Sequence, residues 1–138
     1  MKVNRFPTLD DARAYYARAV DAAAGRIRGR HLTDVTGQTM TYEFKRQDAV
    51  AFQNAGEPNE PDNYPWVAAE ADAMGDTMSA AATEIVGRAN AWWDAGVAIE
   101  RERMQAKYAV RNAATPRAMK EATDTAEAAM QAISDAIP

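Results

Sequence analysis

The chain has 138 residues, which fits one domain of ordinary size, and it carries a formal net charge of −4 and no cysteine. The lack of cysteine excludes disulfides, thiolate metal sites and cysteine nucleophiles, and the acidic balance offers no general attraction to nucleic-acid phosphates. Hydrophobic residues make up 47% of the chain, but 32 of them are alanine and only two are leucine. We therefore expect a thin core that gains stability from a partner or from self-association.

The first predicted element is a helix that begins after Thr8. Thr8 is a suitable N-cap, and acidic residues follow it in the first turn. Apolar residues then recur at intervals of three and four over residues 9–27, which indicates one buried helix face. The helix is expected to end near Gly25.

The next segment predicts a β-hairpin. Threonine and valine become frequent, and Gly37 separates residues 31–35 from residues 38–42. An isolated two-stranded ribbon is marginally stable, so we expect the first helix or another chain to cover it. A short helix over residues 43–55 should follow and stop at Gly56.

A polar linker with two prolines over residues 57–64 divides the chain into a front part, residues 1–56, and a helical rear part, residues 65–138. Pro65 suits the first position of a short helix that Gly75 would end. The expected inner face of this helix consists of Trp66, Ala69 and Ala73.

A long helix is predicted over residues 78–114, because no proline interrupts its apolar periodicity. Thr115 and Pro116 then form an N-cap signal for a last helix. We therefore predict a mainly α fold with a small β-hairpin, in which an α+β front part precedes a long central helix. The last helix should pack against that central helix as an antiparallel helical hairpin.

Two adjacent tryptophans stand in the long helix and point about 100° apart, so one core cannot hold both. The sequence leaves three interpretations open: packing between helices of this chain, burial at a subunit interface, and a platform that stacks on sugars. The residues that we expect to make interactions are Trp92, Trp93, Val97, Met104 and Tyr108.

Residues with catalytic or metal-binding chemistry are sparse. His31 is the only histidine and has no second ligand at metal-binding spacing. Glu57, Glu60 and Asp62 cluster in the linker, but their spacing does not match a calcium loop, and a solvated linker is the favoured interpretation. We expect no enzymatic activity, no cofactor and no metal.

Three arginines alternate near the end of the first predicted helix: Arg26, Arg28 and Arg30. In a strand they would share one face, where a solvated surface is favoured over an anion or RNA contact in an acidic chain. No stretch approaches the roughly 20 apolar residues of a membrane span, and the N-terminus lacks a secretory h-region. We expect synthesis in the cytoplasm and no nucleic-acid or membrane partner.

Several segments between Gly25 and Pro116 follow one another in an order that resembles that of a known protein family. They are Leu32-Thr33-Asp34-Val35-Thr36-Gly37-Gln38, Thr41-Tyr42 with Lys45, Ala49 and Phe52, Tyr64-Pro65 with Ala69-Glu70-Ala71 and Gly75, then Ile85, Trp92, Ile99-Glu100, Arg103 and Ala106-Lys107, and finally Ala113-Ala114-Thr115-Pro116. Together they resemble a family of small proteins encoded among the tail and tail-fibre genes of tailed bacteriophages.

The resemblance implies a structural protein of the phage tail, associated with the fibre or baseplate and acting through protein–protein contacts. The alternative is an assembly chaperone for the tail fibre that is not retained in the virion. Either protein would be made in the host cytoplasm, bind other tail proteins and form a homo-oligomer, and the structural one would reside in the virion. No catalytic residues carry over.

Overall fold

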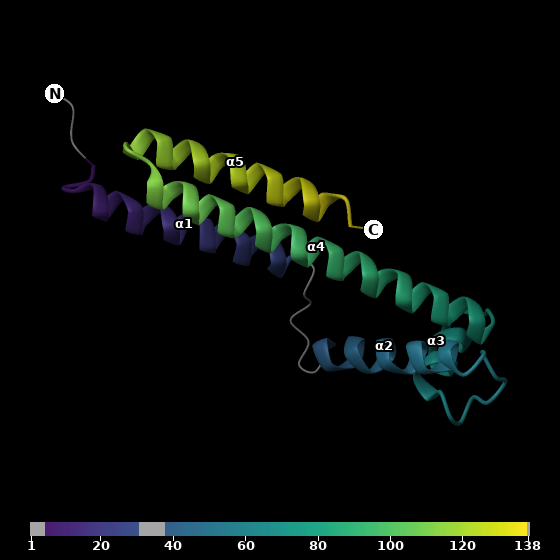
Figure 1. The fold of residues 1–138 in the computed structure, drawn as a ribbon. Helices are drawn as coiled ribbons and strands as arrows, with labels where there is room; N and C mark the ends of the chain where they lie inside the picture. Colours follow the sequence, from purple (N-terminus) through teal and green to yellow (C-terminus); the bar gives the residue numbers. More distant parts are fainter. Residues whose placement is uncertain (1–4, 31–37, 138) are drawn as a thin grey trace. The chain divides into compact units, whose positions relative to one another are not determined.

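The computed structural model describes residues 5–30 and 38–137, and within them the chain forms five helices and no strand (Figure 1). The helices are α1 (Leu9–Gly29), α2 (Gln38–Asn54), α3 (Pro65–Met74), α4 (Met78–Asn112) and α5 (Pro116–Asp135). The chain divides into two compact units: Met1–His31 with Asp94–Pro138, and Leu32–Trp93. Helix α4 supplies residues to both.

The predicted mixed fold, with a β-hairpin and an α+β front part, is wrong. Residues 38–42, expected as the second strand, form the beginning of α2. Two local interactions stabilise this helix: the Gln47 amide donates to Glu43 Oε1 at 3.1 Å, and Arg46 lies 3.7 Å from the same oxygen. Threonine costs only a few tenths of a kcal/mol more than the best residues in a helix, so the segment extends α2. The other expected strand and its turn at Gly37 lie outside the described residues.

Most of the helix ends that the sequence predicts are confirmed. Thr8 accepts a hydrogen bond from the Asp11 amide at 3.1 Å, and Thr115 accepts one from the Ala118 amide at 3.1 Å. Gly75 ends α3 with a left-handed φ of 66°, as a C′ glycine does. The predicted end of α1 near Gly25 is wrong, because the helix continues through Gly25 to Gly29.

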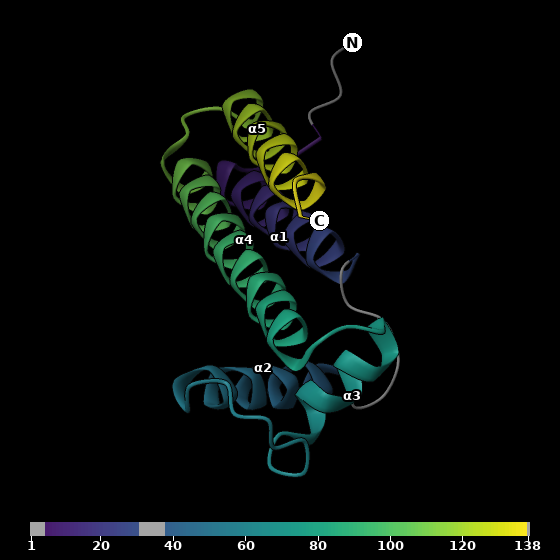
Figure 2. The ribbon, with the colours of Figure 1, turned by 90° about the vertical axis from the view of Figure 1, so that its right-hand side faces the viewer.

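The first unit is a bundle of α1, α5 and the part of α4 from Asp94 onward. α4 runs antiparallel to both other helices (Figures 1 and 2). Two buried clusters hold the three helices together. They consist of Val20, Ala23, Ala24, Ile27, Ile99, Ala106, Ala126 and Met130, and of Ala12, Tyr16, Val110 and Met119. Alanine and methionine replace the scarce leucine, so the helices approach closely around flexible side chains.

The second unit packs α2, α3 and the beginning of α4 around Phe52, which is 2% exposed. Helix α3 presents Val67 and Ala71 to this core. The expected inner face of α3, made of Trp66, Ala69 and Ala73, is therefore wrong, and all three residues are exposed.

Candidate interaction surface on helix α4

The C-terminal half of α4 has one buried face and one exposed apolar face. Ile99, Ala106 and Val110 are between 1% and 5% exposed and enter the bundle core. Residues on the opposite side of the same helix stay in contact with water. The periodicity of the helix therefore separates two apolar faces, of which the bundle covers only one.

The exposed apolar face consists of Val97, Met104 and Tyr108. These side chains are 46%, 53% and 67% exposed, and they stand seven and four residues apart, which places them on one side of a helix. A single exposed apolar residue is ordinary, but a cluster on one face is typical of a site that another molecule covers. We call these three residues the α4 face. All three are among the residues that the sequence predicts to make interactions.

The two tryptophans belong to the second unit. Trp92 is 37% exposed and Trp93 is 73% exposed. Within the described part of the chain, Trp93 is thus not wedged between helices, which removes the interpretation that both indoles fill an intramolecular core. Burial at an interface and stacking on a sugar remain predictions for Trp93.

A row of charged side chains joins α1 to α4 within the first unit. Arg103 donates to Asp21 at 2.7 Å and to Glu100 at 2.8 Å, and Arg28 donates to Glu100 at 2.6 Å. Lys107 completes the row with a bond of 2.9 Å to Asp21. Exposed ion pairs are individually weak, but a connected network fixes the two helices in register better than an isolated pair does.

The same network sets the protonation of its acids. Hydrogen bonds from Arg103 and then from Arg28 lower the pKa of Glu100 from 4.5 to about 2. A hydrogen bond from Lys107 is the main cause that lowers the pKa of Asp21. The bonds from Glu100 and Asp21 raise the pKa of Arg103 in turn. The two acids of the row therefore stay ionised to a lower pH than an ordinary carboxyl group does.

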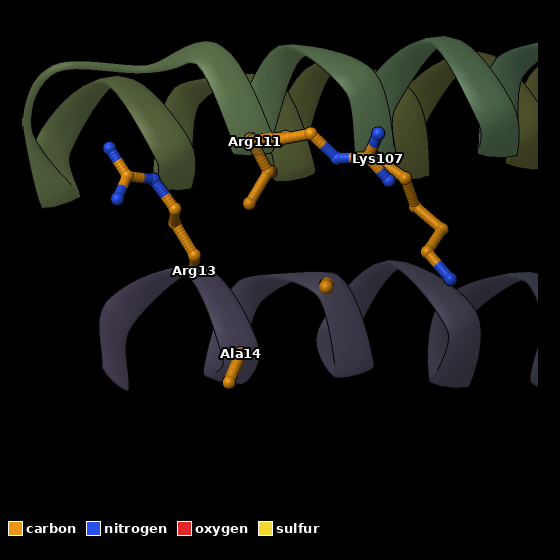
Figure 3. Close-up of a pocket in the computed structure, with 6 residues that line it drawn as sticks. Arg13, Ala14, Lys107 and Arg111 are labelled. Atoms are coloured by element: carbon orange, nitrogen blue, oxygen red, sulfur yellow. The ribbon is translucent and has the colours of Figure 1, made fainter. Parts of the chain in front are cut away.

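A groove of about 230 Å³ lies between α1 and α4 in the first unit. Figure 3 shows Arg13 rising from α1 and Lys107 reaching down from α4 toward α1. The residues that line the groove are Arg13, Ala14, Ala17, Lys107, Val110 and Arg111. Sequence reasoning missed this groove. The sequence shows that Lys107 and Arg111 stand four residues apart on one helix. It does not show that α1 packs beside them.

The other residues considered for chemistry are used in local structure or lie outside the described residues. Ser79 donates to Glu57 at 2.8 Å, and Asn63 donates to Glu60 at 2.7 Å. Among the residues that the structure describes, no group of three or more histidine, aspartate or glutamate side chains is placed to hold a metal ion. His31 lies outside the described residues.

The three alternating arginines stand at the end of α1, and each makes an ion pair with another helix. Arg26 pairs with Glu127 and Arg30 with Asp135, both on α5, while Arg28 pairs with Glu100 on α4. Their alternation therefore does not mark one face of a strand. Their role in this structure is to hold the helices of the bundle together.

Comparisons with models of protein families, with curated proteins and with solved structures each return no match for this chain. Over the described residues, none of the helices has both the length and the apolar character needed to cross a membrane.

Proposed function

We propose that this chain is a structural protein of a phage tail that joins or decorates the fibre or baseplate by binding another protein. The observation that carries the proposal is the α4 face, Val97, Met104 and Tyr108, which leaves three large apolar side chains on one side of a helix in water. The resemblance of the sequence to small proteins encoded among tail genes gives the context in which that surface would be covered.

The thin core supports a binding role as well. Few large side chains are fully buried, and alanine fills much of the core of both units. Burial of apolar surface contributes about 25 cal/mol per Å², so covering the α4 face adds stability that the chain gains only when bound. A protein of this kind is more stable within an assembly than alone.

Mass spectrometry of purified virions tests the proposal. A structural protein is retained in mature particles in a fixed ratio to the known tail proteins, and it remains after washing at high salt. An assembly chaperone is present in the infected cell but missing from the particle. Absence of the chain from particles that are otherwise complete would contradict the structural role and favour the chaperone.

A further inference from the structure

The groove between α1 and α4 has the dimensions of a site for side chains. Its volume of about 230 Å³ lies below the roughly 300–1,000 Å³ of typical small-molecule pockets. The lining includes two alanines of α1, Ala14 and Ala17, and Val110 of α4. Small residues along a groove between two helices let a third backbone come close, as in the packing of helix bundles.

The rim of the groove carries three cations, two of which are paired with acids of this chain. Three of the six lining residues are cations, Arg13, Lys107 and Arg111, and none of the six is acidic. Lys107 is already paired with Asp21, and Arg13 pairs with Asp10 at 2.9 Å. The Nε atom of Arg13 is buried without a hydrogen-bond partner.

The side chain of Arg111 makes no ion pair or hydrogen bond with any residue that the structure describes. It lies on the exposed side of α4. The groove therefore has one free guanidinium and one unsatisfied buried N–H, in a chain whose overall charge is −4. Arg13 already donates to Asp10 and, at 3.4 Å, to the Ala113 carbonyl, so an acceptor from outside the chain would pair first with the Arg111 guanidinium.

The groove continues into the α4 face. Met104, Lys107, Tyr108 and Arg111 follow one another at i, i+3, i+4 and i+7, so they form one strip along the helix. A molecule lying in the groove would thus contact apolar and cationic side chains alternately. An amphipathic helix with apolar and acidic residues at the same spacing has the matching pattern.

We propose that this groove and the adjoining α4 face receive an amphipathic helix of another protein, one of whose carboxylates pairs with Arg111. The proposal rests on the proposed function and adds the chemistry of the partner. A two-fold contact between grooves of two copies would set like charges against each other, which favours a different protein as the occupant.

The test uses the full chain and two synthetic helical peptides of about 20 residues, a length that spans roughly 30 Å. Both peptides are rich in alanine and carry leucines on one face. One has glutamates four residues apart beside the leucines, and the other has glutamines there. Fluorescence anisotropy measures the binding of each at low and at high salt.

We expect the glutamate peptide to bind roughly three- to tenfold more tightly at low salt, with a difference that shrinks at high salt, because exposed charge pairs are modest and screened. Arg111→Glu should remove this preference. Ala14→Trp should weaken both peptides, because the indole fills the groove. Arg117→Glu is the matched control on α5, where the side chain is 88% exposed, and it should leave both affinities within about twofold.

Three results would overturn the proposal: equal binding of the two peptides, no binding of either, or binding that Arg111→Glu leaves unchanged. A fourth comes from sedimentation of the chain without peptide. If the chain forms a dimer and Ala14→Trp dissociates it, the occupant of the groove is a second copy of the chain. Circular dichroism verifies that both variants keep the wild-type helix content. Retention of the chain in virions, measured separately, would leave the proposed function intact even if the peptides fail to bind.

Discussion

At the scale of single residues, Glu100 shows how the charged row depends on pH. Its pKa in the folded protein is about 2, against an ordinary value of 4.5. A carboxyl group whose pKa is lowered by folding contributes stability that is complete above 4.5 and is lost as the pH falls from there toward 2. The lowered pKa of Asp21 acts in the same direction.

Replacing Glu100 by glutamine should therefore destabilise the protein at pH 7 and have a progressively smaller effect below pH 4.5. Urea unfolding of wild type and variant between pH 7 and pH 3 measures this. Glu121→Gln is the control, because its partner Arg117 is almost fully exposed and the pair is 3.3 Å long. If the difference between wild type and Glu100→Gln stays constant over this pH range, the pairing assigned to Glu100 is wrong.

The residues of the α4 face could be selected from the sequence because the apolar sector of the long helix is wider than one neighbour covers. Their exposure could not be predicted, since periodicity does not reveal which side of the sector the bundle occupies. Arg13 and Arg111 were not recognised as parts of one site. They are 98 positions apart, from 13 to 111, and only the packing of α1 on α4 brings them to the same groove.

At the scale of elements, the sequence predicted best where a signal is local. The caps at Thr8 and Thr115 and the glycine that ends α3 act through hydrogen bonds or dihedral angles within a few residues. The β-hairpin failed for the opposite reason. The frequent threonines fit a strand, but a helix tolerates them. Here they form the beginning of α2, whose apolar face buries Phe52 further along the helix.

The beginning of helix α3 is capped by a contact with α2 that no nearby sequence motif predicts. Its N-cap residue, Tyr64, makes no side-chain cap. Instead, Asp48 of α2 accepts a hydrogen bond from the Val67 amide at 2.9 Å. This bond satisfies one of the free amides at the beginning of α3 and places a negative charge at the positive end of the helix.

Asp48→Ala should therefore cost about 1 kcal/mol, as the loss of an N-cap does, and Asp48→Asn should cost less because the amide oxygen can still accept. Urea unfolding gives the free energy, and hydrogen exchange of the Val67 amide reports on the bond itself. Asp62→Ala, in the exposed loop before α3, is the control and should change neither. Unchanged exchange at Val67 in Asp48→Ala would show that the bond does not protect α3.

At the scale of the whole molecule, the chain builds three small buried clusters, two in the first unit and one in the second. α1 and α5 stand at opposite ends of the sequence, yet they pack in the same unit. Composition predicted how thin these cores are, because two leucines cannot supply many large buried side chains. It could not predict the pairing of α1 with α5, because an amphipathic face specifies that a helix must be covered but not by which helix.

Such cores leave the α4 face exposed on the first unit, and our central claim is that another protein covers it. Methionine oxidation measures this coverage directly, because an exposed thioether reacts with peroxide and a covered one is protected. Met104 is 53% exposed, while Met119 and Met130 are completely buried and serve as internal controls.

Peroxide treatment of the free chain and of purified virions, followed by mass spectrometry, gives the oxidation of each methionine in both states. The account predicts that Met104 is oxidised rapidly in the free chain and protected in the virion, while Met119 and Met130 stay protected in both. Equal oxidation of Met104 in the free chain and in the particle would contradict it, because the α4 face would then remain in water after assembly.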